Sequence, residues 1–215
     1  MSEYRLQDGE LISERALRQG AKNTLLPRVL NAVALASLGA SAVLATPKPI
    51  ASGVLKTVQR DGVLLDGLGN WVQAWREVDK FTSDEQSSQA EKEEAYRLEL
   101  IAAKKTALQR HALVVETAGV TIDNQLVGSD REAVARVTSA LSLLGRSPGA
   151  SIPFSTRSGA WLTGDKASLE GLQTVLWAHL KATAENEKAH SDALDGLSTA
   201  QAVADHDITS GWPGA

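Results

Sequence analysis

Apolar residues recur in two ways along this chain. In some stretches they return every three or four positions, and in others they form short runs bounded by glycine, proline, asparagine or aspartate. The first pattern predicts amphipathic helices, and the second predicts strands joined by tight turns. Because hairpin-like runs and helical stretches follow one another in both halves of the chain, we expect an α+β fold.

Residues 1–80 are expected to form a small N-terminal α+β domain. Ser13 is a suitable cap for a short helix, and the pattern predicts a second helix from about Val29 to Leu38. Gly39 would end that helix, because glycine readily adopts the backbone conformation found just after a helix. A short strand is expected to follow, up to Thr46.

Two turn sequences divide the rest of this domain into strands. Asp61-Gly62 lies between apolar runs and predicts a hairpin, and the segment 66–70 predicts a second turn before a strand from Trp71 to Val78. Trp71 and Trp75 share one face of that strand, because side chains alternate between faces. Both are candidate contact residues. We favour packing of the two indoles against the N-terminal helix, and the alternative is a platform that stacks on a glycan.

Residues 81–113 are expected to form a connecting helix, from about Ser83 to His111. Thr82-Ser83-Asp84-Glu85 matches a capping box, in which the first hydroxyl and the last carboxylate satisfy free backbone amides. Charges are acidic early in this stretch and basic late, an order that complements the helix dipole. The first half is otherwise polar, so we expect it to be solvated.

The second half of this helix carries the candidate contacts with a partner or with a second copy. Leu98, Ile101 and Leu108 lie on one stripe, and Tyr96 and Leu100 lie on a neighbouring stripe. This seam is shorter than the roughly three to four heptads that identify a coiled coil. It therefore packs either on the chain's own C-terminal domain or on copies of itself, and the sequence leaves both alternatives open.

Residues 114–215 are expected to form a compact C-terminal α+β domain. Asp123-Asn124 predicts a hairpin turn, and Ser129-Asp130-Arg131-Glu132 matches a second capping box in front of a helix. A second hairpin is expected over residues 152–163, followed by a long helix over about residues 166–190.

The end of the chain adds two expectations. A last short helix should begin near Ser198, since Ser198-Thr199-Ala200-Gln201 again resembles a capped start. Trp212-Pro213 should then close the domain by docking the indole on the helix layer.

Composition limits the partners and the chemistry. Hydrophobic content is 43 % and charged content 22 %, as in an ordinary folded chain. The net charge of -4, without a long basic block, argues against nucleic acid and anionic membranes as partners. The chain has no cysteine, which excludes disulfides and thiolate metal sites. The apolar stretch 25–45 contains proline, arginine and asparagine and is rich in alanine, so membrane insertion is not expected.

The titratable residues do not form a recognisable catalytic or metal-binding motif. His179 and His190 would lie about 16.5 Å apart along one helix, too far to share an ion. Asp205-His206-Asp207 matches an exposed polar loop better than a cation site. No nucleophile elbow, phosphate-binding glycine loop or paired carboxylates were found, so we expect no enzyme activity, no metal and no cofactor.

Two stretches carry a resemblance to a known group of proteins. The first combines Thr46-Pro47-Lys48-Pro49, Asp61-Gly62, the strand from Gly69 to Trp75 and Thr82-Ser83-Asp84-Glu85. The second combines residues 119–123 and 129–133, the hairpin 155–162, His179 and Gly211-Trp212-Pro213. The first resembles the N-terminal part of small tailed-bacteriophage tail-region proteins. The second is similar to the domain of unknown function that ends phage tail and tail-fibre-associated proteins.

The chain departs from the pattern of that family at two places. Phe154 stands where the family's hairpin usually opens with tryptophan, and Lys181-Ala182-Thr183-Ala184 follows His179 where aromatic or cysteine residues are frequent. No role is therefore carried over to His179. The family has no established catalytic residues to transfer.

The resemblance implies a structural protein of the virion tail, made in the host cytoplasm. It would be a fibre, a fibre adaptor or a baseplate-peripheral subunit that bridges other phage tail proteins, and a homo-oligomer, with a trimer favoured for a fibre. The alternative is a tail fibre assembly chaperone that is absent from the mature virion.

Overall fold

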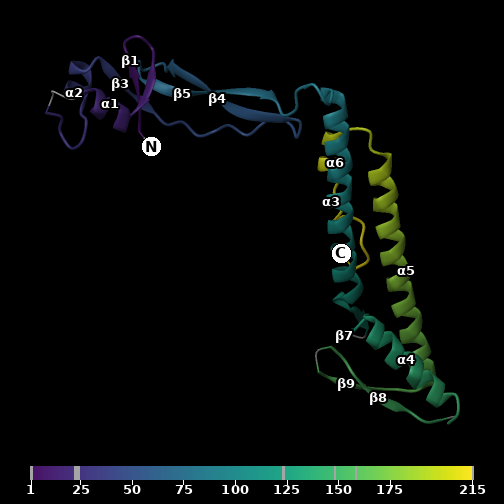
Figure 1. Cartoon of the computed structure of the whole chain (residues 1–215). Helices are drawn as coiled ribbons and strands as arrows, with labels where there is room; N and C mark the ends of the chain where they lie inside the picture. Colours follow the sequence, from purple (N-terminus) through teal and green to yellow (C-terminus); the bar gives the residue numbers. More distant parts are fainter. Residues whose placement is uncertain (1, 22–24, 123, 148, 158, 215) are drawn as a thin grey trace. The chain divides into compact units, whose positions relative to one another are not determined.

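Both helices and strands build the structure, so the expected α+β class is confirmed (Figure 1). The structure is a computed structural model that describes residues 2–21, 25–122, 124–147, 149–157 and 159–214. The chain divides into two compact units, Met1–Gln89 and Ala90–Ala215, called here the N-terminal and the C-terminal unit. The helix that was predicted to connect two domains belongs almost entirely to the C-terminal unit.

The N-terminal unit is built on a five-stranded sheet with the order β2-β1-β3-β5-β4. The strands are β1 (Glu3–Leu6), β2 (Leu11–Ser13), β3 (Ala40–Leu44), β4 (Lys56–Leu65) and β5 (Trp71–Asp79). The β3–β5 pair is parallel, and the other pairs are antiparallel. The core of this unit is small, with Tyr4, Leu17, Leu35 and Ala40 as its buried members.

Two short helices supply half of that core. Helix α1 (Glu14–Gly20) starts at Ser13, whose hydroxyl accepts the amide of Ala16. Helix α2 (Ala32–Ser37) starts at Asn31, whose side chain accepts the amide of Ala34 at 2.9 Å. Side chains that satisfy free amides in this way stabilise the first turn. The expected helix, its stop near Gly39 and the strand after it are all present, although α2 is shorter than predicted.

The hairpin predicted at Asp61-Gly62 was wrong. These residues lie inside the single strand β4, at a bulge between Arg60 and Val63, where Gly62 has a φ of 75°. A bulge can use the same left-handed glycine as a tight turn, so the dipeptide alone does not distinguish them. The actual turn to β5 lies at 66–70, where the Asp66 carboxylate accepts the amides of Leu68 and Asn70. These hydrogen bonds lower the pKa of Asp66, and the one from the Asn70 amide has the largest effect.

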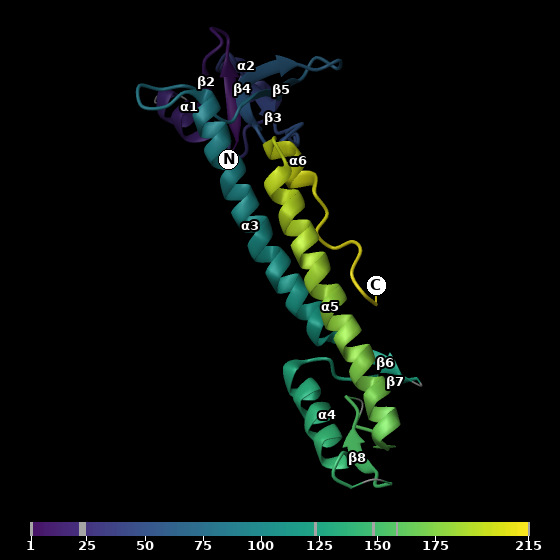
Figure 2. The same cartoon turned by 90° about the vertical axis from the view of Figure 1, so that its right-hand side faces the viewer.

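In the C-terminal unit, two long helices run side by side and antiparallel (Figures 1 and 2). They are α3 (Gln89–Ala118) and α5 (Lys166–Gly196), and the short helix α6 (Ala200–Asp205) follows α5. Two buried clusters join them: Ile101 of α3 with Leu194 and Val203, and Leu108 and Ala112 of α3 with Trp212. The long helix continues past the predicted end at residue 190, and the docking of Trp212 on the helix layer is confirmed.

Helix α3 begins six residues later than predicted and ends later as well. Asp84 accepts the amides of Gln86 and Ser87 at 3.0 and 2.9 Å, which forms a local turn in place of a helix start. The Ser83 hydroxyl accepts the amide of Gln89. The expected capping box over residues 82–85 is therefore wrong, because the aspartate side chain satisfies these amides in a non-helical loop.

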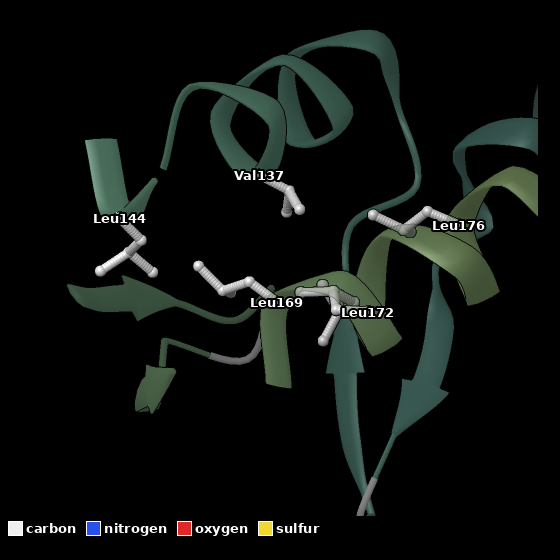
Figure 3. Packing of buried hydrophobic residues seen from close by; sticks show 6 residues of the cluster. Val137, Leu144, Leu169, Leu172 and Leu176 are labelled. Atoms are coloured by element: carbon white, nitrogen blue, oxygen red, sulfur yellow. The ribbon is translucent and has the colours of Figure 1, made fainter. Parts of the chain in front are cut away.

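The largest core lies where α5 begins. Two hairpins, β6 (Val120–Ile122) with β7 (Gln125–Val127) and β8 (Ile152–Ser155) with β9 (Trp161–Gly164), meet α4 (Arg131–Leu144) and α5 there. The side chains of α4 point toward those of α5, as Figure 3 shows for Val137, Leu144, Leu169, Leu172 and Leu176. Both hairpins were predicted, and Asn124 has the left-handed φ of 61° that its turn requires. Asp123 and Ser158 lie outside the described residues.

Ser129 holds the end of α3 to the hairpin that follows it. The hydroxyl accepts the amide of Gly119 at 3.0 Å and donates to the carbonyl oxygen of Glu116, and the side chain is fully buried. The cap of α4 is its neighbour Asp130, which accepts the amide of Ala133 at 2.8 Å. The capping box predicted over residues 129–132 was therefore wrong, because Asp130 caps α4 alone and Ser129 caps the carboxyl end of α3 instead.

Candidate functional site

The predicted contact residues of α3 separate into buried and exposed ones. Ile101 and Leu108 are 8 % and 1 % exposed and pack inside the C-terminal unit, and Leu100 lies beside the cluster of Ile101. Tyr96 is half-buried, whereas Leu98 is 53 % exposed. Of the two alternatives for this seam, the chain's own C-terminal part therefore occupies Ile101 and Leu108. Leu98 is not covered by that part and remains exposed.

Leu98 belongs to a second stripe, which lies about 100° around the helix from the buried one. Its exposed members follow one another at intervals of three or four residues, and we call them the outer stripe: Leu98, Ala102, Thr106, Gln109 and Leu113. Leu113 is 59 % exposed, and its neighbour Val114 is 63 % exposed. Leu98 and Leu113 are fifteen positions apart, or about 22 Å along the helix axis, so the outer stripe is long enough for a helix–helix contact.

The sequence missed Leu113 because the helix was expected to end at His111. Helix α3 in fact continues to Ala118, which gives the outer stripe its second exposed leucine. The β-branched run Val114-Val115 after Leu113 resembles a strand start more than a helix end, since such residues are favoured in strands. Had the helical periodicity been followed past Val114-Val115, it would have placed Leu113 on the same stripe as Leu98.

The side of α3 that faces α5 is fixed by polar contacts as well as by apolar packing. Arg97 donates to the carbonyl oxygen of Leu197 at 2.7 Å, and Lys105 pairs with Asp195 at 2.6 Å. His179, buried on α5, lies 3.0 Å from the carbonyl oxygen of Val115 through its Nε2. Because these contacts are spread along the helix pair, they fix the rotation of α3 and keep the outer stripe turned outward.

Trp71 and Trp75 lie on the sheet face opposite the core of the N-terminal unit. Glu3, Val43 and Trp71 are paired across three neighbouring strands, so their side chains lie on the same face of the sheet. Tyr4 follows Glu3 in β1 and therefore points to the other face, which carries the core. The favoured expectation that these indoles pack against the N-terminal helix was therefore wrong. The alternation of β5 was predicted correctly, but the sequence did not show which face the helices cover.

Arginine side chains cover both indoles. The Arg5 guanidinium lies 4.0 Å from the ring centroid of Trp71, and that of Arg60 lies 5.8 Å from that of Trp75. Arg60 also pairs with Glu3 at 2.7 Å. Each indole is thus part of a cation–π contact within the sheet. A sugar stacking on the same ring face would have to displace the guanidinium.

Trp75 is also held by a hydrogen bond, which leads to a prediction. Its Nε1 donates to the hydroxyl of Thr46 at 2.9 Å, and that hydroxyl donates to the carbonyl oxygen of Gln73 at 2.8 Å. Trp75→Phe should lower the free energy of unfolding of the N-terminal unit by about 1 kcal/mol or more, because the hydrogen bond and part of the ring are lost. Chemical denaturation measures the change. Trp161→Phe is the control, since Trp161 is 71 % exposed, and equal effects of both variants would contradict the expectation.

The carboxylates with shifted pKa values act in caps and pairs. Hydrogen bonds from Ser52 lower the pKa of Glu77, and those from Arg97 lower the pKa of Glu94. At the start of α5, the amide of Ser168 lowers the pKa of Asp165. Such contacts stabilise the charged form. In the described ranges, no three histidine, aspartate or glutamate side chains gather as metal ligands would. Over the same ranges, no helix has the length and apolarity needed to cross a membrane.

A groove of about 660 Å³ lies between α4 and the β8–β9 hairpin. Its walls are largely apolar and include Ala133, Val137, Ala140 and Phe154, and Trp161 lies among its lining residues. The side chains that line it come from the same elements as the largest core. It is the second surface of the C-terminal unit, after the outer stripe, that is apolar and open to solvent.

Comparison with known proteins adds no relative to this picture. No protein-family model, no curated protein and no solved structure matches the chain.

Proposed function

We propose that this chain is a structural component of a bacteriophage tail, a fibre, fibre adaptor or baseplate-peripheral subunit that connects other tail proteins. The exposed outer stripe of α3 is the observation that carries the proposal. It lies on a helix whose buried side is already filled by α5, α6 and Trp212, and its two leucines remain exposed to solvent. The sequence resemblance to tail proteins supplies the setting.

Two units with separate cores suit a bridging role. Each unit has its own buried cluster, and each presents different chemistry: a sheet face with arginine-covered tryptophans in one, and the outer stripe and the apolar groove in the other. A protein that connects two partners needs two such independent surfaces. No residue is assigned a catalytic role in this proposal, and no cofactor or metal is needed.

The outer stripe is proposed as the contact between copies of the chain. A leucine stands at each end of it, and the small residues Ala102 and Thr106 between them allow a second helix to approach closely. Parts of a tail are present in several copies, and closed symmetry uses the same surface of each copy. A trimer around α3 is the arrangement we favour, as in a fibre.

Replacing both exposed leucines of the outer stripe tests this contact. The variant Leu98→Asp with Leu113→Asp should sediment as a monomer while its circular dichroism stays unchanged, because buried carboxylates oppose the contact but both positions are solvent-exposed in the single chain. The control is Leu143→Asp with Val175→Asp, which changes exposed apolar residues of α4 and α5 and should leave the oligomer intact. A wild-type protein that is already monomeric at high concentration would contradict the proposed oligomer.

Mass spectrometry of purified phage particles tests the location. A stoichiometric signal, counted against the major tail protein, would support a virion component, and its multiplicity would report the symmetry. Abundance in the infected-cell lysate together with absence from particles would contradict the virion role. That result would favour the assembly chaperone instead.

A further inference from the structure

The last described residues, 206–214, form a segment that we call the C-terminal strap. It follows α6 and returns along the α3–α5 pair, as the yellow trace in Figure 2 shows. Trp212 anchors it: the indole is 5 % exposed, packs with Leu108 and Ala112 of α3, and donates from Nε1 to the carbonyl oxygen of Ile208 at 2.9 Å. The strap has no regular secondary structure of its own, so its position depends on these side-chain contacts.

A pair of histidines fixes the strap to α5. His190 Nδ1 lies 3.0 Å from His206 Nε2, and His190 Nε2 lies 3.0 Å from the carbonyl oxygen of Ser210. The Trp212 indole stacks on the His190 ring at 5.9 Å between centroids. Both hydrogen bonds and the stacking contact therefore pass through His190.

The partners of these nitrogens limit how many protons the pair can hold. The Ser210 carbonyl oxygen only accepts, so His190 Nε2 carries a hydrogen. In the neutral ring the other nitrogen, Nδ1, then accepts a hydrogen from Nε2 of His206. One additional proton can be placed on His206 Nδ1 without breaking the bond. A second additional proton puts two N–H groups against each other across 3.0 Å, and the pair must separate.

The charged groups around the pair oppose even the first of these protons. From α3, the Lys104 ammonium donates to the carbonyl oxygens of Ala204 and His206 at 3.0 and 2.7 Å, next to the pair. His111, also from α3, contacts Trp212 edge-on at 5.1 Å. From the strap itself, the Asp207 carboxylate acts in the opposite direction and favours a charged histidine. Lys104 and His190 thus oppose a proton on His206, and the Asp207 carboxylate favours it.

The pKa of His206 lies below its ordinary value of 6.5. Burial is the main cause, and the positive charges of His190 and Lys104 lower the pKa further. The Asp207 carboxylate raises it by a smaller amount. The unfolded or released form takes up a proton more readily than the docked form. Docking is therefore fully favoured above pH 6.5, the ordinary value, and it is lost as the pH falls through the lower pKa of the docked state.

We propose that His190 and His206 form an acid-sensitive latch, and that protonation of both rings releases the C-terminal strap from α3 and α5. Release removes Trp212 from Leu108 and Ala112 and uncovers the apolar, formerly buried side of α3. Mildly acidic conditions thus convert a closed helix pair into one that offers a new apolar surface. The latch stands independently of a role in a phage tail.

Hydrogen–deuterium exchange of the strap as a function of pH tests the latch on the full chain. After correction for the intrinsic pH dependence of exchange, the amides of residues 207–214 should exchange about tenfold faster at pH 5.5 than at pH 7.5. Two pH units change the proton concentration about 100-fold, so one linked proton allows an increase of this size. The amides of α4 serve as the internal reference, because that helix carries no histidine.

Two substitutions of His206 separate the latch from general acid destabilisation. In His206→Gln the amide nitrogen can donate to neutral His190, as the ring nitrogen of His206 did. When His190 is protonated, the amide can flip so that its oxygen accepts a hydrogen bond from His190. The strap should therefore stay protected at both pH values. His206→Arg carries one permanent charge but can still donate to the Nδ1 atom of neutral His190, so it corresponds to the singly protonated pair. Its strap should therefore stay protected at pH 7.5 and exchange faster than that of the wild type at pH 5.5, where a proton on His190 completes the release. Should His206→Gln lose helical circular dichroism at pH 7.5, His190→Gln takes its place, because its amide can still donate to Ser210.

The result that overturns the latch is equally definite. An acid response in His206→Gln or in His190→Gln of the same size as in the wild type would show that another group controls the strap. A wild-type strap whose corrected exchange does not change between pH 7.5 and pH 5.5 would show that no latch exists.

Discussion

Leu176→Ala is expected to lower the free energy of unfolding of the C-terminal unit by about 3–5 kcal/mol, the range typical of a fully buried leucine replaced by alanine. Leu176 is 0 % exposed and lies in the largest core, among side chains of α4, α5 and both hairpins. Truncation removes the contacts of its branched end and leaves a cavity. Because the cluster joins residues of α4, α5 and both hairpins, we do not expect the surroundings to close that cavity.

The neighbouring residue offers a matched control for this loss. Val175→Ala changes the same helix one position earlier, but Val175 is 42 % exposed, so its truncation should cost less than about 1 kcal/mol. Urea denaturation followed by the helical circular dichroism signal compares the two variants. Equal losses for both would show that the core of this unit lies elsewhere.

Ser129→Ala is expected to cost about 2–4 kcal/mol, although it removes one oxygen atom. The hydroxyl accepts a hydrogen bond from the amide of Gly119 and donates one to the carbonyl oxygen of Glu116, and the side chain has no access to solvent. Alanine would leave both backbone groups without a partner, and each unsatisfied buried group costs about 1–3 kcal/mol. The loss should be localised, with faster amide exchange over the last turn of α3 and the β6–β7 hairpin.

The control for this prediction is a serine with a single, replaceable hydrogen bond. Ser142 on α4 donates to the carbonyl oxygen of Thr138 and is exposed, so Ser142→Ala should change the free energy of unfolding by no more than about 0.5 kcal/mol. If Ser129→Ala were equally mild, a water molecule in place of the hydroxyl would be the simplest explanation.

Local signals in the sequence predicted the elements well wherever a turn or a cap could form in only one way. The hairpin at Asn124, the start of α1 at Ser13 and the long helix from Lys166 were all found on this basis. They were less reliable where one side chain had two local options. Asp84 forms a turn before α3 instead of a capped helix start, and Gly62 forms a bulge within β4 instead of a hairpin.

The candidate contacts were only half predictable for a different reason. Periodicity placed Ile101 and Leu108 on an apolar stripe of α3, but it does not say which molecule covers that stripe. The answer depends on α6 and on Trp212, about 100 residues away in sequence. The arginine cover of Trp71 and Trp75 is similarly non-local, since Arg5 belongs to a strand at the other end of the unit's sequence. Such contacts cannot be derived from spacing within one element.

The long separation between α3 and its partners also affects how the protein is made. Arg97 can form its hydrogen bond only after Leu197, 100 residues later, has been synthesised, and Leu108 can be covered only after Trp212 has been synthesised. At the usual rate of translation, roughly 5–20 residues per second, the inner side of α3 is exposed for about 5–20 s after it leaves the ribosome. During that interval its apolar residues are accessible to other nascent copies translated on the same message. Assembly with sister chains could thus begin before the C-terminal unit has closed, and the order of synthesis would favour partners from one polysome.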